Sequence, residues 1–206
     1  MIHDPFVSFT DLLLSIEAGI FAFWIARHAP RGTLRTLVTA LFTALTGASF
    51  FGALFHAFFP LQVATSGGWY MWILTTCWLG AVAVMLYALS VHCIFGPRVL
   101  RVVWIPLLAL FVVYEYCIVA VDYHYSTVID FYAPALAIFS FYALWKALTS
   151  TSGWGVVFFG AALTAVAALA QSSTIEIGPL DHNAIYHVLQ ALALALLFIG
   201  FRRVMS

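Results

Sequence analysis

Histidines at three positions are the side chains in this sequence most suited to metal chemistry. His182 and His187 lie five residues apart in the last apolar stretch, and His56 lies near the end of the second. A catalytic zinc site takes three protein ligands, of which imidazole is a common one, and leaves a further position for water. Positions five apart differ by about 140° on an ideal helix, so His182 and His187 can share one ion only where the helix start is distorted. We predict His56, His182 and His187 as candidate metal ligands.

Carboxylates within apolar stretches could serve such a site. Asp11 and Glu17 lie in the first stretch, and Glu115 lies in the fourth between two tyrosines. Leaving an unpaired carboxylate in an apolar medium costs on the order of several kcal/mol, and ionisable groups in membrane segments usually mark functional sites. Because metal-bound histidines are commonly oriented by a carboxylate, we predict these three acids as candidates for that role.

Small and polar residues share helix faces with the histidines. Ser49, Gly52 and His56 are spaced i, i+3 and i+7, which is one face of a helix. Asn183 and His187 are spaced i, i+4 and also face the same way. A glycine on such a face lets another helix approach closely. The spacing therefore predicts one polar site shared between helices.

The elements that must position these residues are long apolar helices. The chain has 206 residues, of which 65% are hydrophobic and 8% charged, whereas about 25% are charged in a soluble domain. A spanning helix needs about 20 apolar residues, and such stretches satisfy their backbone groups in a membrane only as helices. We predict an all-α, seven-transmembrane helix bundle forming a single domain over 1–206. The predicted spans are about 8–28, 36–59, 69–94, 102–121, 127–147, 154–172 and 181–201.

Positive charges follow alternate predicted spans. The eight cationic residues are Arg27, Arg31, Arg35, Arg98, Arg101, Lys146, Arg202 and Arg203. Lys and Arg concentrate in cytoplasmic loops, which predicts an N-terminus outside the cytoplasm and a cytoplasmic C-terminus. The acids and most histidines then fall in the outer half of the membrane. Short loops favour the bacterial inner (plasma) membrane, and a net charge of zero gives no reason to expect a nucleic-acid partner.

Several of these residues have a purely structural interpretation. An acid in the first turn of a helix, such as Asp130 or Asp181, is favoured as a cap or by the helix dipole. A lone histidine near an interface is often only hydrogen-bonded. The three cysteines form no metal-type pair in the sequence and are typical of small buried apolar residues. The gathering of polar groups from five spans at one depth is what favours a site.

Two short motifs resemble those of the CREST superfamily of seven-helix membrane proteins. The run from Leu180 to His187 is similar to its seventh-span motif, and the pair Phe55-His56 resembles its second-span histidine. That superfamily includes alkaline ceramidases, GPI-anchor-remodelling lipid hydrolases and the adiponectin and progestin receptors. The resemblance implies a zinc ion held by three histidines, which activates water to cleave an amide or ester in a lipid.

The chain departs from the motifs of that superfamily at three places. The first seventh-span histidine falls on Asn183 in strict register, with His182 one place early. The serine four residues before the second-span histidine is replaced by Gly52, and Ser49 lies one turn further away. The predicted third span, 69–94, contains no acid. Each departure removes a ligand or a catalytic helper.

Three functions remain open from the sequence. The first is a zinc-dependent hydrolase of a lipid amide or ester, with His56, His182 and His187 on the metal, Glu17 or Asp11 as base or orienting group, and Ser49 polarising the carbonyl. The second is a non-enzymatic lipid- or ligand-binding protein, or an accessory subunit that works with partner subunits or as a homo-oligomer. The third is a transporter or proton pump, which the scarcity of polar groups in the inner half disfavours.

Overall fold

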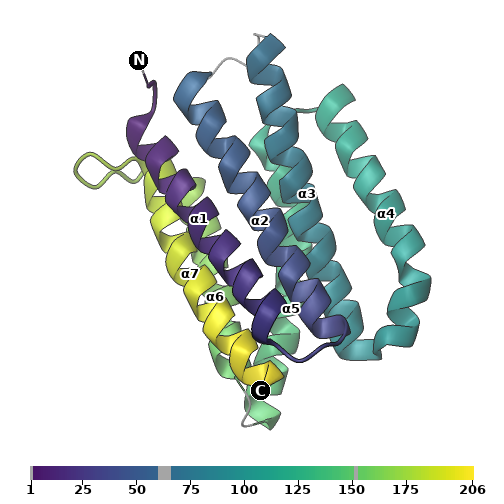
Figure 1. Cartoon of the computed structure of the whole chain (residues 1–206). Coiled ribbons are helices and arrows are strands. Elements are labelled where there is room, and N and C mark those ends of the chain that lie inside the picture. Colours follow the sequence, from purple (N-terminus) through teal and green to yellow (C-terminus); the bar gives the residue numbers. More distant parts are fainter. Residues whose placement is uncertain (1, 60–65, 151–152) are drawn as a thin grey trace.

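Seven α-helices make up almost all of the part of the chain that the structure describes (Figure 1). The computed structural model describes residues 2–59, 66–150 and 153–206. The helices are α1 (Pro5–His28), α2 (Thr33–Phe58), α3 (Ser66–Phe95), α4 (Pro97–Ala120), α5 (Tyr125–Thr149), α6 (Trp154–Gln171) and α7 (His182–Met205). The predicted all-α bundle of seven helices is confirmed, and each helix begins and ends within a few residues of its predicted span.

Each of these helices is long and apolar enough to cross a membrane. Most backbone groups pair within each helix, as a membrane requires, although Pro106 in α4 and Pro134 in α5 lack the N–H that would pair with the carbonyl one turn earlier. Several serine and threonine hydroxyls in the helices follow the same rule: Thr75 and Ser90, for example, donate to the carbonyl one turn earlier at 2.9 Å. Many large apolar side chains point outward, particularly on α4. The seven helices therefore indicate a multi-pass membrane protein.

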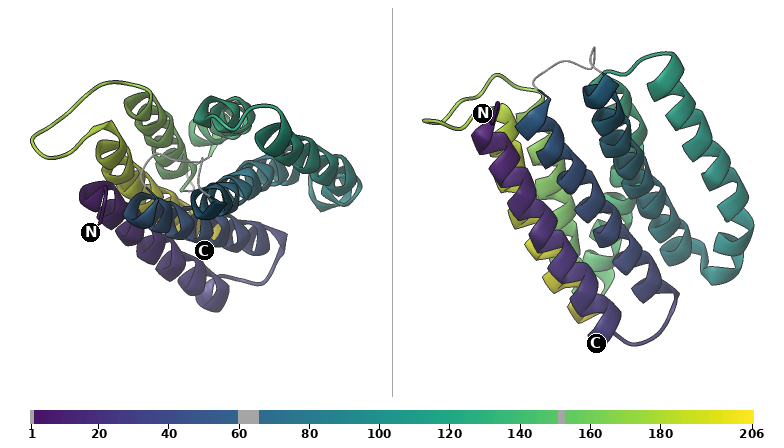
Figure 2. Two further views of the ribbon diagram at one scale, coloured as in Figure 1. Left: turned by 90° about the horizontal axis from the view of Figure 1, so that it is seen from above. Right: turned by 45° about the horizontal axis from the view of Figure 1, so that its top comes forward.

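Six of the helices close into a ring, and α4 lies outside it. Neighbours around the ring are α1 and α2, α2 and α3, α3 and α5, α5 and α6, α6 and α7, and α7 and α1. By contrast, α4 packs mainly on α3 and touches α5 only slightly, and Figure 2 shows it at the edge of the bundle in both views. This arrangement decides which polar side chains can meet inside the ring.

The two ends of the bundle carry opposite charge. Helices α1, α3, α5 and α7 all start at the end that holds Asp4, which we call the acidic end (Figure 1). The opposite end, which we call the basic end, holds the last turns of these helices and all eight Lys and Arg residues. The described segments that form the basic end, 24–38, 92–104, 143–150, 153–157 and 198–206, contain no acid.

Glycines bring α6 and α7 into backbone contact. A Cβ on Gly160 would lie 2.9 Å from Leu197 N, and one on Gly200 would lie 2.7 Å from Val157 N. Side chains larger than hydrogen at these positions would therefore force the helices apart, as in other close membrane-helix pairs. The orientation of α7 about its own axis is fixed by this contact.

Candidate functional site

A cavity of about 340 Å³ opens at the acidic end of the bundle. Its walls come from α1, α2, α3, α5 and α7, together with the last residue of α6 and the connection before α5. Apolar and aromatic side chains make up most of the lining, while Asp11, Ser49, His56, His187 and Gln190 supply polar groups. Ligand pockets commonly combine mostly apolar walls with a few placed polar groups in volumes from about 300 Å³ upward.

The centre of the site is a buried pair between α1 and α7. His187 Nε2 lies 3.2 Å from Asp11 Oδ1, and each side chain is only 7% exposed. His187 Nδ1 lies 3.0 Å from Thr10 Oγ1. Because Thr10 Oγ1 lies 2.9 Å from Phe6 O and 3.0 Å from Val7 O, its single proton is donated to the backbone. Thr10 therefore accepts a hydrogen bond from His187 Nδ1.

This arrangement leaves one proton to be shared between His187 and Asp11. The Nδ1 proton of His187 is already donated to Thr10, so the second ring nitrogen faces the carboxylate across 3.2 Å. A bare lone pair facing a bare carboxylate would be repulsive, and a buried charge is stable only when paired. One proton between Nε2 and Oδ1 satisfies both groups. The pair is thus a place where a proton, or a cation in its stead, is held.

Gly52 makes the space that the Asp11 carboxylate occupies. A Cβ built on Gly52 would lie 2.7 Å from Asp11 Oδ2 and 3.4 Å from Asp11 Cγ. The serine that the motif comparison leads one to expect at this position would therefore displace the carboxylate. In this chain, glycine at position 52 leaves the room in which the Asp11 carboxylate is buried.

Amide side chains extend the polar lining along α7. Gln171 Nε2 donates to Asn183 Oδ1 at 2.6 Å, and Gln190 Nε2 donates to Thr164 Oγ1 at 3.3 Å. The Oε1 atoms of both glutamines are buried and have no hydrogen-bond partner in the part of the chain that the structure describes. Such acceptors are rare in folded proteins, because leaving them unpaired is costly. They provide places for a donor from a bound molecule.

Two further histidine–aspartate pairs lie at the mouth of the cavity. His56 Nδ1 lies 3.7 Å from Asp4 Oδ2. Asp122, in the connection between α4 and α5, accepts from His124 N at 3.0 Å and pairs with the His124 ring. The backbone N–H of His124, and then its ring, hold the pKa of the Asp122 carboxyl below its usual value. The Asp122 carboxylate therefore carries negative charge at the entrance at neutral pH.

The structure gathers four of the seven candidate residues predicted from the sequence. Asp11, Ser49, His56 and His187 all line the cavity. The half-buried Glu17 and His182 do not line it. The reason for His182 is that α7 is helical from this residue onward, with Asp181 capping its first turn through a 2.8 Å bond from Ala184 N. With no distortion there, Asn183 faces the cavity in its place.

Glu115 also lies apart from the cavity. It belongs to α4, outside the ring of six helices, and does not line the cavity. Its Oε1 atom is buried without a hydrogen-bond partner among residues 2–59, 66–150 and 153–206. The predicted gathering of polar groups therefore does not extend to this acid.

The described residues do not form the three-ligand metal site expected from the motifs. Within the described ranges, no group of three or more His, Cys, Asp or Glu side chains is placed to hold a metal ion. Asp11 and His187 converge, but His56 is turned toward Asp4 and His182 lies outside the lining. A zinc ion with two nitrogen ligands from α7 does not fit this donor set, so we derive no reaction through one.

Several residues of the site were not singled out from the sequence. Thr10, Gln171 and Gln190 take part through their hydrogen bonds, and Tyr125 and Tyr186 interact with each other and with Asp11. One signal was available for Gln190. Asn183, Tyr186, His187 and Gln190 are spaced i, i+3, i+4 and i+7, which places all four on one helix face.

The fold and the cavity together define a seven-helix membrane-type bundle with a polar site at one end. The chain belongs to a family described as a family of unknown function (DUF6962), whose match covers residues 6–206. Comparison with curated proteins and with solved structures finds no match. The resemblance to the CREST superfamily stays a prediction.

Proposed function

We propose that this chain is a multi-pass membrane protein that binds a small amphipathic molecule, such as a lipid or lipid-like compound, in the cavity at the acidic end. Following the positive-inside rule, the acidic end faces away from the cytoplasm, and a bacterial inner membrane suits its short connections. The observation that carries the proposal is a largely apolar cavity whose lining includes a buried Asp11–His187 pair and a Gln190 Oε1 with no hydrogen-bond partner among the described residues.

Binding is favoured over hydrolysis by the way the polar groups are engaged. Both ring nitrogens of His187 have partners, namely Thr10 and Asp11. A general base must reach the proton that it removes, and both ring nitrogens are already engaged by these partners. Zinc-dependent hydrolysis is the competing proposal, and it predicts one zinc per chain, lost in Asp11→Ala/His187→Ala. Binding without a metal predicts purified protein that holds ligand with no stoichiometric zinc.

A cavity-filling variant tests the binding proposal. Ala48 lines the cavity on α2 and is 5% exposed, so Ala48→Phe places a ring inside it. The matched control is Ala165→Phe, on the exposed surface of α6. Native mass spectrometry of protein released from mild detergent should show a bound small molecule in the unchanged chain and the control, and not in Ala48→Phe. Equal occupancy in all three proteins would contradict the proposal.

A further inference from the structure

The charge around the cavity is arranged for a cation. Each histidine of the lining is paired with an aspartate: His56 with Asp4, His124 with Asp122, and His187 with Asp11. Neither lysine nor arginine lines the cavity, since all eight lie at the basic end. The three carboxylates offer counter-charges to a bound cation, whereas an anionic head group would meet carboxylates and carbonyl oxygens that have no donor among the described residues.

Aromatic rings form one wall of the same cavity. The Trp72 ring centroid lies 5.5 Å from that of Phe55 and 6.4 Å from that of Tyr125, so α2, α3 and α5 contribute one ring each. Trp72 Nε1 donates to Tyr123 O at 2.9 Å, which fixes the indole ring. The faces of aromatic rings attract cations, most strongly for tryptophan.

Hydrogen-bond acceptors that lack a donor among the described residues favour cations that carry N–H groups. Gln190 is 3% exposed and its Oε1 has no donor within the described part of the chain. A primary ammonium carries three N–H donors, whereas a quaternary ammonium carries none. Asp11, Gln190 and the aromatic wall are thus complementary to an N–H-bearing cation attached to an apolar chain.

We propose that the cavity binds the primary ammonium head of an alkylamine-type amphiphile, with Asp11 as its counter-ion and Trp72 on its flank. This rests on the proposed binding function and names the ligand class. On binding, the ammonium takes the place of the proton shared by Asp11 and His187, which leaves as a free proton while His187 stays neutral. The other titratable groups near Asp11 are Tyr186 on α7, His56 on α2 and Tyr125 on α5, and the lining residues of α3 and α6 add none.

Isothermal titration of three probes with the same chain length tests the head group. Octylammonium, octanol and octanoate are titrated into the whole chain in maltoside detergent at pH 7.5, and the Ala48→Phe protein supplies the blank for micelle partitioning. We expect octylammonium to bind at least tenfold more tightly than either other probe. Repeating the titration in two buffers of different ionisation enthalpy should show about one proton released per ammonium bound. A second arm with lysophosphatidylethanolamine separates a lipid head group from a free amine as the source.

Variants separate the counter-ion from general effects. Asp11→Asn should weaken octylammonium binding at least tenfold, whereas Asp130→Asn, the same change at an exposed acid on α5, should leave it unchanged. Trp72→Leu gives an independent reading if Asp11→Asn does not fold, with several-fold weaker ammonium binding and unchanged octanol binding. Equal binding of all three probes above the blank would overturn the ammonium proposal and leave the binding function standing. Failure of every probe to exceed the blank would overturn both.

Discussion

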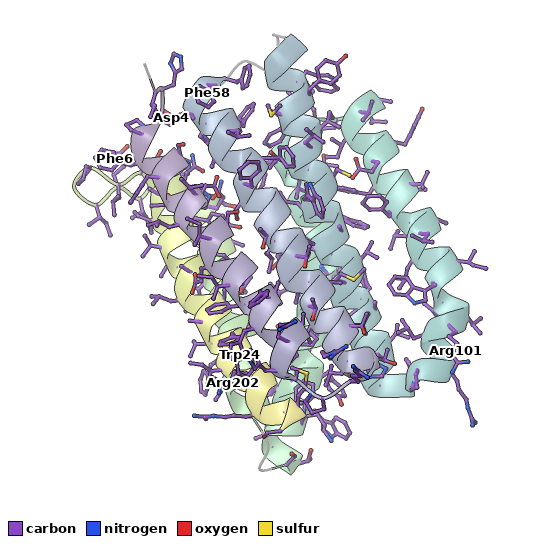
Figure 3. All side chains as sticks on the ribbon, in the orientation of Figure 1. Asp4, Phe6, Trp24, Phe58, Arg101 and Arg202 are labelled. Atoms are coloured by element: carbon purple, nitrogen blue, oxygen red, sulfur yellow. The ribbon has the colours of Figure 1, made fainter. Side chains whose placement is uncertain are left out.

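Both ends of the bundle are hollowed, but they use their polar groups in opposite ways. At the acidic end, Asp11 and His187 face each other inside the ring of helices. At the basic end, a hollow of about 420 Å³ lies between the last turns of α1 and α7, where the exposed Arg202 stacks on the Trp24 ring at 4.2 Å (Figure 3). Arg35 reaches the carbonyls of Ala26 and Ala29 at 3.5 Å.

The two ends therefore show how differently charged residues behave at the surface of the bundle and in its interior. Cations at helix C-termini satisfy carbonyls and the helix dipole while they stay in contact with solvent or head groups, so they serve orientation at little cost. A buried acid has no contact with solvent or head groups, so its charge is stable only beside a partner. The buried pair at the acidic end therefore suits the proposed binding site, and the exposed cations of the basic end suit the orientation that the positive-inside rule predicts.

Breaking the buried pair at the acidic end should have the largest effect on stability. Asp11→Ala or His187→Ala leaves one polar group buried without its partner, which typically costs about 3–5 kcal/mol. The double variant should cost clearly less than the sum of the two single changes, because it removes both members. Unfolding by denaturant in mixed micelles measures the cycle. Additive losses would show that the two side chains do not depend on each other.

Filling the space at Gly52 should have an intermediate effect. Gly52→Ala pushes a methyl group against Asp11 Oδ2, and overpacking of this kind costs about 1–3 kcal/mol. The control is Gly19→Ala on α1, whose Cβ would lie 3.6 Å from Thr46, an ordinary contact. That change should be neutral or slightly stabilising, since alanine is the better helix former. Equal losses of unfolding free energy in both variants would argue against a role for Gly52 beside Asp11.

Removing the stacked arginine at the basic end should have the smallest effect. Arg202→Ala loses an exposed cation–π contact with Trp24, worth about 0.5–1 kcal/mol. We expect unchanged binding of octylammonium, because the cavity lies at the other end of the bundle. Thermal unfolding and the titration described above give the two measurements. A loss of affinity in this variant would show that the ends are coupled and would break the contrast between them.

The sequence was sufficient for the helices because length and hydropathy decide them. A run of about 20 apolar residues must satisfy its own backbone in a membrane, so the seven spans follow without knowledge of their neighbours. The gathering of Asp11, Ser49, His56 and His187 also followed, since depth along each span can be counted from its end. Each of these predictions can be made from a single helix, without knowing which helices lie beside it.

The remaining details depend on which helices meet and how each is turned. Glu115 has a depth that suits the site, but α4 lies outside the ring, and depth alone does not reveal this. Thr10 matters because α1 packs on α7, which brings it to His187. His182 was expected beside His187, whereas an undistorted helix start turns Asn183 inward. Position around the helix axis, set by packing, is the information that one sequence lacks.

The glycine contact between α6 and α7 places a constraint on length rather than on side-chain type. Gly200 is anchored against Val157, and His187 lies thirteen residues before it on the same helix. Each residue turns a helix by about 100°, so deleting one residue between these two points would swing His187 away from Asp11 while Gly200 stayed in place. Apolar residues between them could be exchanged freely among similar sizes, yet their number could not change. The number of residues between Gly200 and His187 thus sets the direction in which His187 points.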